Sequence, residues 1–114
     1  MSGSLSLQVF LLRLKKVWRH PDRVVVAQRV KNLQSMSELE LSMKDIERMC
    51  LQLVPADWVV GPSPDDKGRG TDVWVFHPIY KGTKMYLKLS LTPVEGVDYL
   101  RVISCHREGM VQPT

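Results

Sequence analysis

The chain has few cysteines and no long apolar run. Cys50 and Cys105 are its only cysteines, and they form neither a C-x-x-C pair nor part of a spaced His/Cys set. We therefore expect no zinc site and no disulfide scaffold, and a reducing cytoplasm suits the composition best. The longest apolar run near the N-terminus, LQVFLLRL, is broken by Gln8 and Arg13 and is too short to span a bilayer. No association with a membrane is expected.

Signatures of nucleotide-dependent and hydrolytic enzymes are also missing. The sequence contains no G-x-x-x-x-G-K-[ST], no G-x-G-x-x-G and no G-x-S-x-G. Carboxylates are scarce in the strand-like segments, and no D-x-D cluster offers a magnesium site. We expect no cofactor and no metal.

The overall composition is that of one folded domain spanning residues 1–114. Hydrophobic residues make up 44% and charged residues 25% of the chain, close to the averages for globular proteins. The formal net charge is +4 and the pI about 9.3. This moderate basic excess is compatible with an anionic partner such as nucleic acid, and equally with none.

Helical periodicity dominates the first half of the chain. Apolar residues recur at spacings of three and four between Leu7 and Trp18, which predicts an amphipathic helix that Pro21 ends. A further helix is predicted from its cap at Ser42 to Pro55. Its apolar stripe consists of Ile46, Met49, Cys50 and Leu53. Cys50 is therefore interpreted as a small buried apolar residue and not as a nucleophile.

Between these two helices the pattern has two interpretations. A helix from about Val25 to Met36 is expected, with an apolar face made of Val26, Val30 and Leu33. The run Val24–Val26, however, also suits a strand, because branched side chains favour extended backbone.

The second half of the chain has the alternation of strands. The segment 61–70, GPSPDDKGRG, is predicted to be a loop. Strands follow at 71–77, 85–91 and 99–105, and seven residues containing a glycine separate each neighbouring pair. Helices first and strands last indicate an α+β fold, with N-terminal helices packed on a small antiparallel sheet.

Alternation also divides the strand residues between two faces. If Met85 and Leu87 face the helices, Tyr86, Lys88 and Ser90 project from the opposite face. On the third strand Leu100, Val102, Ser104 and His106 are expected to share one side. Periodicity alone does not decide which side of that strand meets the helices.

Cationic and aromatic side chains gather on and beside these strands. The candidate residues are His77, Tyr86, Lys88, His106 and Arg107 on the strands, Lys81 and Lys84 in a connection, and Lys67 and Arg69 in the loop. Such a set suits metal-independent RNA cleavage, in which protons move at two ribose oxygens and cations balance the crowded phosphate. The alternative from this pattern alone is an ordinary solvated face. Convergence of Tyr86, His106 and a basic neighbour within about 10 Å would favour the site.

The order of several segments resembles a known family. LKKV at the end of the first helix, IERMCLQLVPADWV (46–59), HPIYKGTKMYLKLSL (77–91) and LRVISCHRE in the last strand are similar to segments of the MqsR-type messenger-RNA interferase toxins, relatives of the RelE fold. The resemblance covers residues 14–107. It implies a RelE-like fold and a toxin of a type II toxin–antitoxin system, with an RNA target that is free or ribosome-bound and a cognate antitoxin as partner.

The resemblance also implies roles for individual residues. Tyr86 falls on the family's active-site tyrosine, Lys88 on a lysine two positions later, and His106 on a catalytic lysine. The expected products are a cyclic phosphate and a free 5′-hydroxyl, with Lys88 or Arg107 stabilising the phosphate charge.

Two positions depart from the family pattern. Val60 stands where the family has a lysine, and Val73 stands where it has a glutamine. These departures favour an alternative, a non-catalytic module on the same fold that binds RNA or a regulatory protein. In a third interpretation the sheet face is a homodimer interface, provided that Trp74, Phe76 and Tyr99 are exposed.

Overall fold

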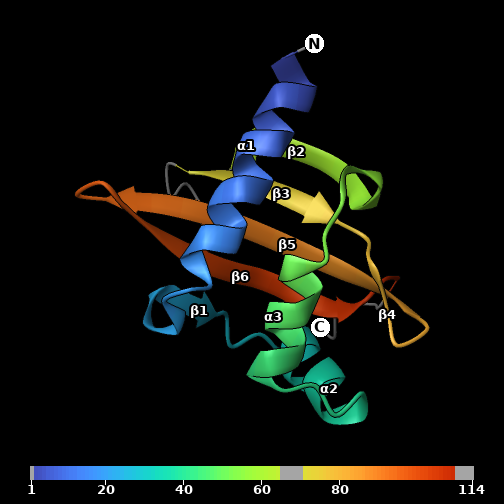
Figure 1. Cartoon of the computed structure of the whole chain (residues 1–114). Coiled ribbons are helices and arrows are strands. Elements are labelled where there is room, and N and C mark those ends of the chain that lie inside the picture. Colours follow the sequence, from blue (N-terminus) through green and yellow to red (C-terminus); the bar gives the residue numbers. More distant parts are fainter. Residues whose placement is uncertain (1, 65–70, 110–114) are drawn as a thin grey trace.

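A six-stranded sheet carries helices on one face (Figure 1). The computed structural model describes residues 2–64 and 71–109, with side chains from residue 6 onward. The helices are α1 (Ser2–Val17), α2 (Val30–Glu38) and α3 (Met43–Leu51), with short 3-10 turns η1 (Pro21–Arg23) and η2 (Pro55–Asp57). The strands are β1 (Val24–Val26), β2 (Trp58–Pro64), β3 (Asp72–Phe76), β4 (Ile79–Tyr80), β5 (Thr83–Val94) and β6 (Val97–Arg107).

The strand order in the sheet is β1-β6-β5-β3-β2, and β4 pairs with β5 beside this path. Every pairing is antiparallel except that of β1 with β6, which is parallel. The predicted α+β class with helices on one face of a mostly antiparallel sheet is confirmed. Within the described residues, no helix has both the length and the apolar character required to cross a membrane.

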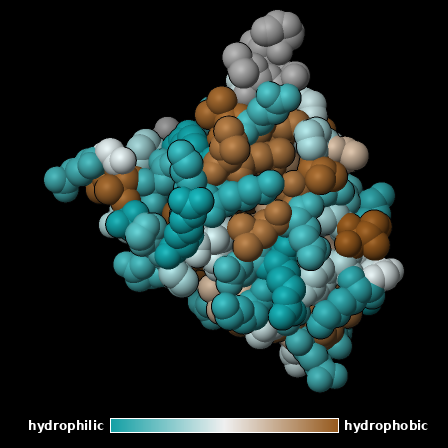
Figure 2. All heavy atoms as spheres, in the orientation of Figure 1, coloured by the Kyte–Doolittle hydropathy of each residue, from teal (hydrophilic) through white to brown (hydrophobic). Residues whose placement is uncertain are grey.

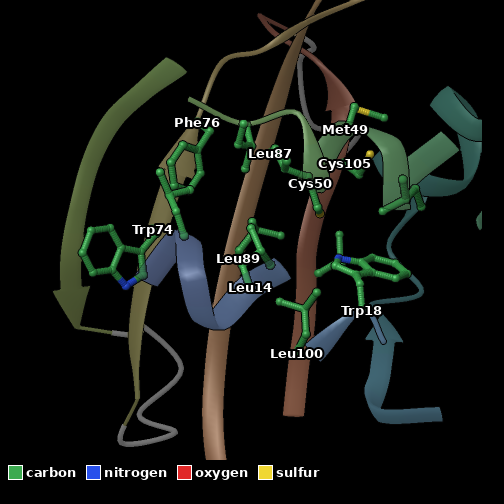
Figure 3. Close-up of a cluster of buried hydrophobic side chains, with 14 of the residues drawn as sticks. Leu14, Trp18, Met49, Cys50, Trp74, Phe76, Leu87, Leu89, Leu100 and Cys105 are labelled. Atoms are coloured by element: carbon green, nitrogen blue, oxygen red, sulfur yellow. The ribbon is translucent and has the colours of Figure 1, made fainter. Parts of the chain in front are cut away.

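The core lies between α1, α3 and the inner face of β5 (Figure 3). The predicted stripe of α1 and the alternate residues of β5 from Met85 to Leu91 are all buried. Phe10 stacks on Trp74 with ring centroids 4.6 Å apart, and Phe76 is fully buried nearby. Each such side chain contributes roughly 1.5–3 kcal/mol by leaving water. Because Trp74 and Phe76 belong to this core, they do not form the exposed aromatic surface that the homodimer interpretation required.

α3 begins as predicted at Ser42 and is held there by a capping box. The Asp45 carboxylate accepts hydrogen bonds from the backbone N–H and the hydroxyl of Ser42, while the Ser42 hydroxyl accepts from the Asp45 N–H. The Tyr80 hydroxyl also donates to Asp45. These bonds, that from Tyr80 foremost, hold the pKa of Asp45 well below its usual range. The cap thus ties α3 to β4.

The prediction for the segment between α1 and α3 is wrong in two respects. Val24–Val26 is strand β1, and the helix starts only at Val30. The expected apolar face is turned outward, since Val30 is 57% and Leu33 49% exposed. The buried side of α2 is polar instead, with Asn32 and Ser35 completely inaccessible.

This polar side of α2 completes the edge of β6. Backbone pairing of β1 with β6 ends at Val26 opposite Val102. Beyond it, the Asn32 amide donates to the Ile103 carbonyl at 3.0 Å and accepts from the Cys105 N–H at 2.8 Å. Buried backbone groups need such partners, so side chains of α2 replace a neighbouring strand. Hydrophobic periodicity cannot reveal a helix that packs through hydrogen bonds.

An irregularity in β6 changes which side chains face the helices. Lys88 pairs with Ser104 but Leu89 pairs with Val102, so Ile103 is an extra residue in the ladder. Val102 and Cys105 therefore both enter the core, although their separation is odd. The prediction that Leu100, Val102, Ser104 and His106 share one side is wrong, because this bulge turns the last two residues to the far face.

Two strand boundaries also differ from the prediction. β2 includes residues 61–64, which were assigned to the loop, while residues 65–70 lie outside the described residues. Gly61 has φ +125°, and a Cβ there would lie 2.7 Å from the Val73 carbonyl oxygen, so this irregular edge strand requires glycine. β5 and β6 are longer than expected and joined by a two-residue turn, in which Glu95 and Gly96 both have positive φ.

Replacing Asn32 tests its role at the edge of β6. Asn32→Ala leaves the Cys105 N–H and the Ile103 carbonyl buried without partners, and we expect it to lower the free energy of unfolding by about 2–4 kcal/mol. Gln34→Ala, on the exposed side of α2, is the control and should change it by less than about 0.5 kcal/mol. Urea denaturation followed by circular dichroism measures both. Equal effects of the two substitutions would contradict the role given to Asn32.

Candidate functional site

A pocket of about 310 Å³ opens on the face of the sheet that the helices leave free. Its lining residues come from three parts of the chain that converge near the end of β6. They are Arg29, Lys31, Tyr86, Lys88, Ser104, His106, Glu108 and Gly109. Three cations and two aromatic rings thus share a small concavity. The predicted convergence of Tyr86, His106 and a basic neighbour is confirmed.

Strand pairing places the two rings in contact. Tyr86 lies directly opposite His106 in the β5–β6 register, and their ring centroids are 5.1 Å apart with planes inclined by only 8°. His77, after β3, lies beside Tyr86 with a centroid separation of 5.6 Å. Tyr86 therefore has an imidazole within ring-contact distance on each of two neighbours. Such offset stacking holds aromatic rings in a defined orientation.

The protonation of His106 follows from its hydrogen bond. Its Nδ1 lies 2.9 Å from the Arg107 carbonyl oxygen, which can only accept, so Nδ1 carries the proton. Nε2 is buried and has no hydrogen-bond partner in the described part of the chain. Burial lowers the pKa of His106, and the positive charges of Lys31 and Arg29 lower it further, against the opposing effect of the Arg107 bond. His106 thus presents a neutral ring with an unpaired basic nitrogen.

Sequence reasoning missed the two cations that lie nearest to this ring in charge effect. Arg29 donates a hydrogen bond from Nη1 to the Ser104 hydroxyl at 2.9 Å, and Lys31 also lines the pocket. Both stand in the segment between β1 and the middle of α2. The only available signal was the strand interpretation of Val24–Val26, because a third neighbour of β6 brings the following residues to the pocket.

Several predicted residues lie elsewhere. Arg107 points to the helix side, where its guanidinium pairs with Glu38 at 2.9 Å. The Lys81 ammonium lies 3.3 Å from Asp45 beside α3. Lys84 is exposed two residues before Tyr86 and does not line the pocket. The predicted substrate contacts from Lys67 and Arg69 lie outside the described residues.

The two positions that depart from the family pattern provide no polar group near the pocket. Val60 is exposed on the edge strand β2, opposite Val75. Val73 is buried on β3, where it and Val75 alternate with the core residues Trp74 and Phe76. The two buried valines thus form an apolar part of the same sheet face.

The chemistry available here is anion binding and proton transfer. Guanidinium and ammonium groups bind phosphate, and a neutral imidazole accepts a proton. Across the described ranges, no three His, Cys, Asp or Glu side chains are grouped to hold a metal ion. Comparison with known proteins gave no match to a family model, to a curated protein or to a solved structure.

The lowered pKa of His106 predicts a pH dependence of stability. Between its folded pKa and the unfolded value near 6.5, the unfolded chain binds more protons, so stability falls as pH drops below about 6.5. We expect His106→Gln to flatten this dependence, while His20→Gln, at an exposed histidine, leaves it unchanged. Urea unfolding between pH 7.5 and pH 5 measures the difference. Parallel curves for wild type and His106→Gln would contradict the lowered pKa.

Proposed function

We propose that this protein is a toxin of the toxin–antitoxin type that cleaves RNA without a metal ion. The observation that carries the proposal is the free Nε2 of His106, presented with a fixed tautomer in a pocket that also contains three cations. The neutral ring can act as a base, and the cations suit a phosphodiester. The resemblance in the sequence supports the same function independently.

The proposed reaction is transesterification by the ribose 2′-hydroxyl. His106 Nε2 takes the hydroxyl proton, and the 2′-oxygen forms a bond to phosphorus as the bond from phosphorus to the 5′-oxygen breaks. The Tyr86 hydroxyl donates the proton that the leaving 5′-oxygen requires. Arg29 and Lys88 balance the charge that accumulates on the phosphate. The products are a 2′,3′-cyclic phosphate and a free 5′-hydroxyl.

A second function, RNA binding without cleavage, is favoured by the burial of His106. Its side chain is only 3% exposed, and Nε2 is covered, so a ribose reaches it only if a neighbouring side chain moves aside. Tyr86, stacked on the ring, is the obvious candidate. The same cations would hold RNA in either case. Cleavage is therefore the measurement that separates the two functions.

The proposal includes the partners that such a toxin requires. A cognate antitoxin would inhibit it by covering the pocket, and acidic side chains would complement Arg29, Lys31 and Lys88. The protein would act in the cytoplasm on messenger RNA. Two buried free thiols, Cys50 and Cys105, suit that reducing compartment.

Cleavage of RNA in the presence of EDTA tests the proposal. Purified protein should cut mixed RNA at discrete sites and leave 5′-hydroxyl ends, with and without ribosomes compared. His106→Gln and Tyr86→Phe should each lower the single-turnover rate at saturating protein by at least about a hundredfold. His20→Gln is the matched histidine control and should retain the wild-type rate. RNA that stays intact under every condition would reject the nuclease in favour of the binding module.

Binding to the pocket is tested separately from cleavage. Arg29→Gln with Lys88→Gln should weaken the binding of short RNA by about tenfold at 0.1 M salt, because each cation releases counterions from a phosphate. The slope of log affinity against log salt should become shallower by about 1. Fluorescence anisotropy with a 2′-O-methyl oligonucleotide, which cannot be cleaved, gives both values. An unchanged affinity and slope would remove the pocket as the RNA site.

A further inference from the structure

Positive charge is concentrated in one short part of the chain. Residues 13–31 contain seven Lys and Arg residues and a single acid, Asp22, a net charge of +6. The remaining residues contain nine cations and eleven acids, a net charge of −2. The basic character of this protein therefore belongs to the segment that runs from α1 through β1 into α2. Clustering on one element is the usual electrostatic sign of a polyanion-binding surface.

A groove of about 280 Å³ lies where this segment leaves α1. Its walls are formed by the end of α1, by η1 and by the turn between β5 and β6. The lining residues are Arg13, Lys16, Val17, Arg19, His20, Arg23, Gly96, Val97 and Asp98. Four Lys or Arg side chains and a histidine thus meet one acid in a second concavity. Hydrophilic residues cover this end of α1 and the adjacent β1 (Figure 2).

The only acid of the groove is already occupied. Asp98 accepts two hydrogen bonds from the Arg13 guanidinium, at 2.6 and 2.9 Å. Lys16 stands in the last turn of α1, where a cation offsets the negative end of the helix dipole. Arg19 and Arg23 lie beyond the helix, and in the described ranges neither forms an ion pair. Their charges are not used by the fold.

The edge of the sheet connects this groove to the His106 pocket. β1 runs parallel to β6 from Val24 opposite Leu100, and the Ala27 N–H still donates to the Val102 carbonyl. Arg23 stands just before this extended stretch and Arg29 just after it, about 20 Å apart at the rise of a strand. Between them Val25 is 59% exposed, and its partner in register is Arg101. Cations therefore occur at both ends and in the middle of the edge.

We propose that a single strand of RNA lies along the β1 edge, from the His106 pocket to the groove at the end of α1. The identity of the polyanion as RNA rests on the proposed function, whereas the path rests on the charges and the geometry. Two hollows joined by an extended edge suit a flexible strand better than they suit the flat surface of an anionic membrane. The strand must exceed about four nucleotides to reach both hollows.

The test compares the affinities of a short and a long strand. The probes are 2′-O-methyl oligonucleotides of about 4 and about 12 nucleotides, whose blocked 2′-oxygens prevent cleavage. Arg19→Gln with Arg23→Gln should weaken binding of the longer probe by about tenfold at 0.1 M salt and make its salt slope shallower by about 1. The same double variant should bind the shorter probe as wild type does.

A matched control removes two cations from another surface. Lys44→Gln with Arg48→Gln makes the same change of charge on the exposed side of α3 and should leave both affinities close to wild type. Circular dichroism shows that each variant is folded. Equal losses in the two double variants, or equal wild-type affinity for both probes, would overturn the path.

Two further outcomes separate the path from the nuclease proposal. Length-dependent binding that requires Arg19 and Arg23, in a protein that cuts no RNA, would support the path and reject the nuclease. Binding of wild type to phosphatidylserine vesicles that is lost in the Arg19 and Arg23 variant, with the affinity for the longer probe unchanged, would assign the groove to a membrane surface and overturn the path.

Discussion

The hydrogen bonds between Asn32 and the edge of β6 are the constraint on which the functional face depends. β1 is only three residues long, so most of the outer edge of β6 has no neighbouring strand. Asn32 supplies a donor and an acceptor to this edge, and Ser35 accepts from the Arg107 N–H. The result resembles one more strand pairing made by side chains. It fixes α2 against the sheet although the helix presents little apolar surface.

Two features of the pocket follow from this arrangement. The chain between β1 and Asn32 must pass the end of β6, which brings Arg29 and Lys31 to the free face. Asn32 also bonds on both sides of the bulge at Ile103, the residue whose insertion turns Ser104 and His106 toward Tyr86. Cations and imidazole thus meet because the same edge that lacks a strand also contains the irregularity.

The sequence predicted those parts of the fold that are held by one-sided burial. The stripes of α1 and α3 and the alternation from Met85 to Leu91 are visible because each element has one apolar and one polar side. α2 fails that test, since Asn32 and Ser35 are its buried residues. The bulge at Ile103 is equally invisible, because an inserted residue leaves the composition of the strand unchanged while reversing its faces.

The candidate site was predicted to the same extent as the strands that hold it. Tyr86, Lys88 and His106 were placed together because the register of β5 and β6 is local. Arg107 was misplaced because a neighbour of His106 in sequence must point to the other side of a strand. Lys81 faces Asp45, whose capping role at α3 attracts a cation that the pattern alone leaves unassigned. Arg29 and Lys31 required knowledge of the parallel pairing of β1.

The same segment carries both the stability of the edge and the charge of the surface. From Arg23 to Lys31, backbone groups pair with β6 while the side chains that point outward are cationic or apolar, and none is acidic. Mutual repulsion among these cations opposes folding, and the bonds of Asn32 must offset it. A bound polyanion would remove that repulsion. Any ligand of this surface is therefore expected to tighten the packing of β1 and α2 on β6, because binding to the folded state alone stabilises it.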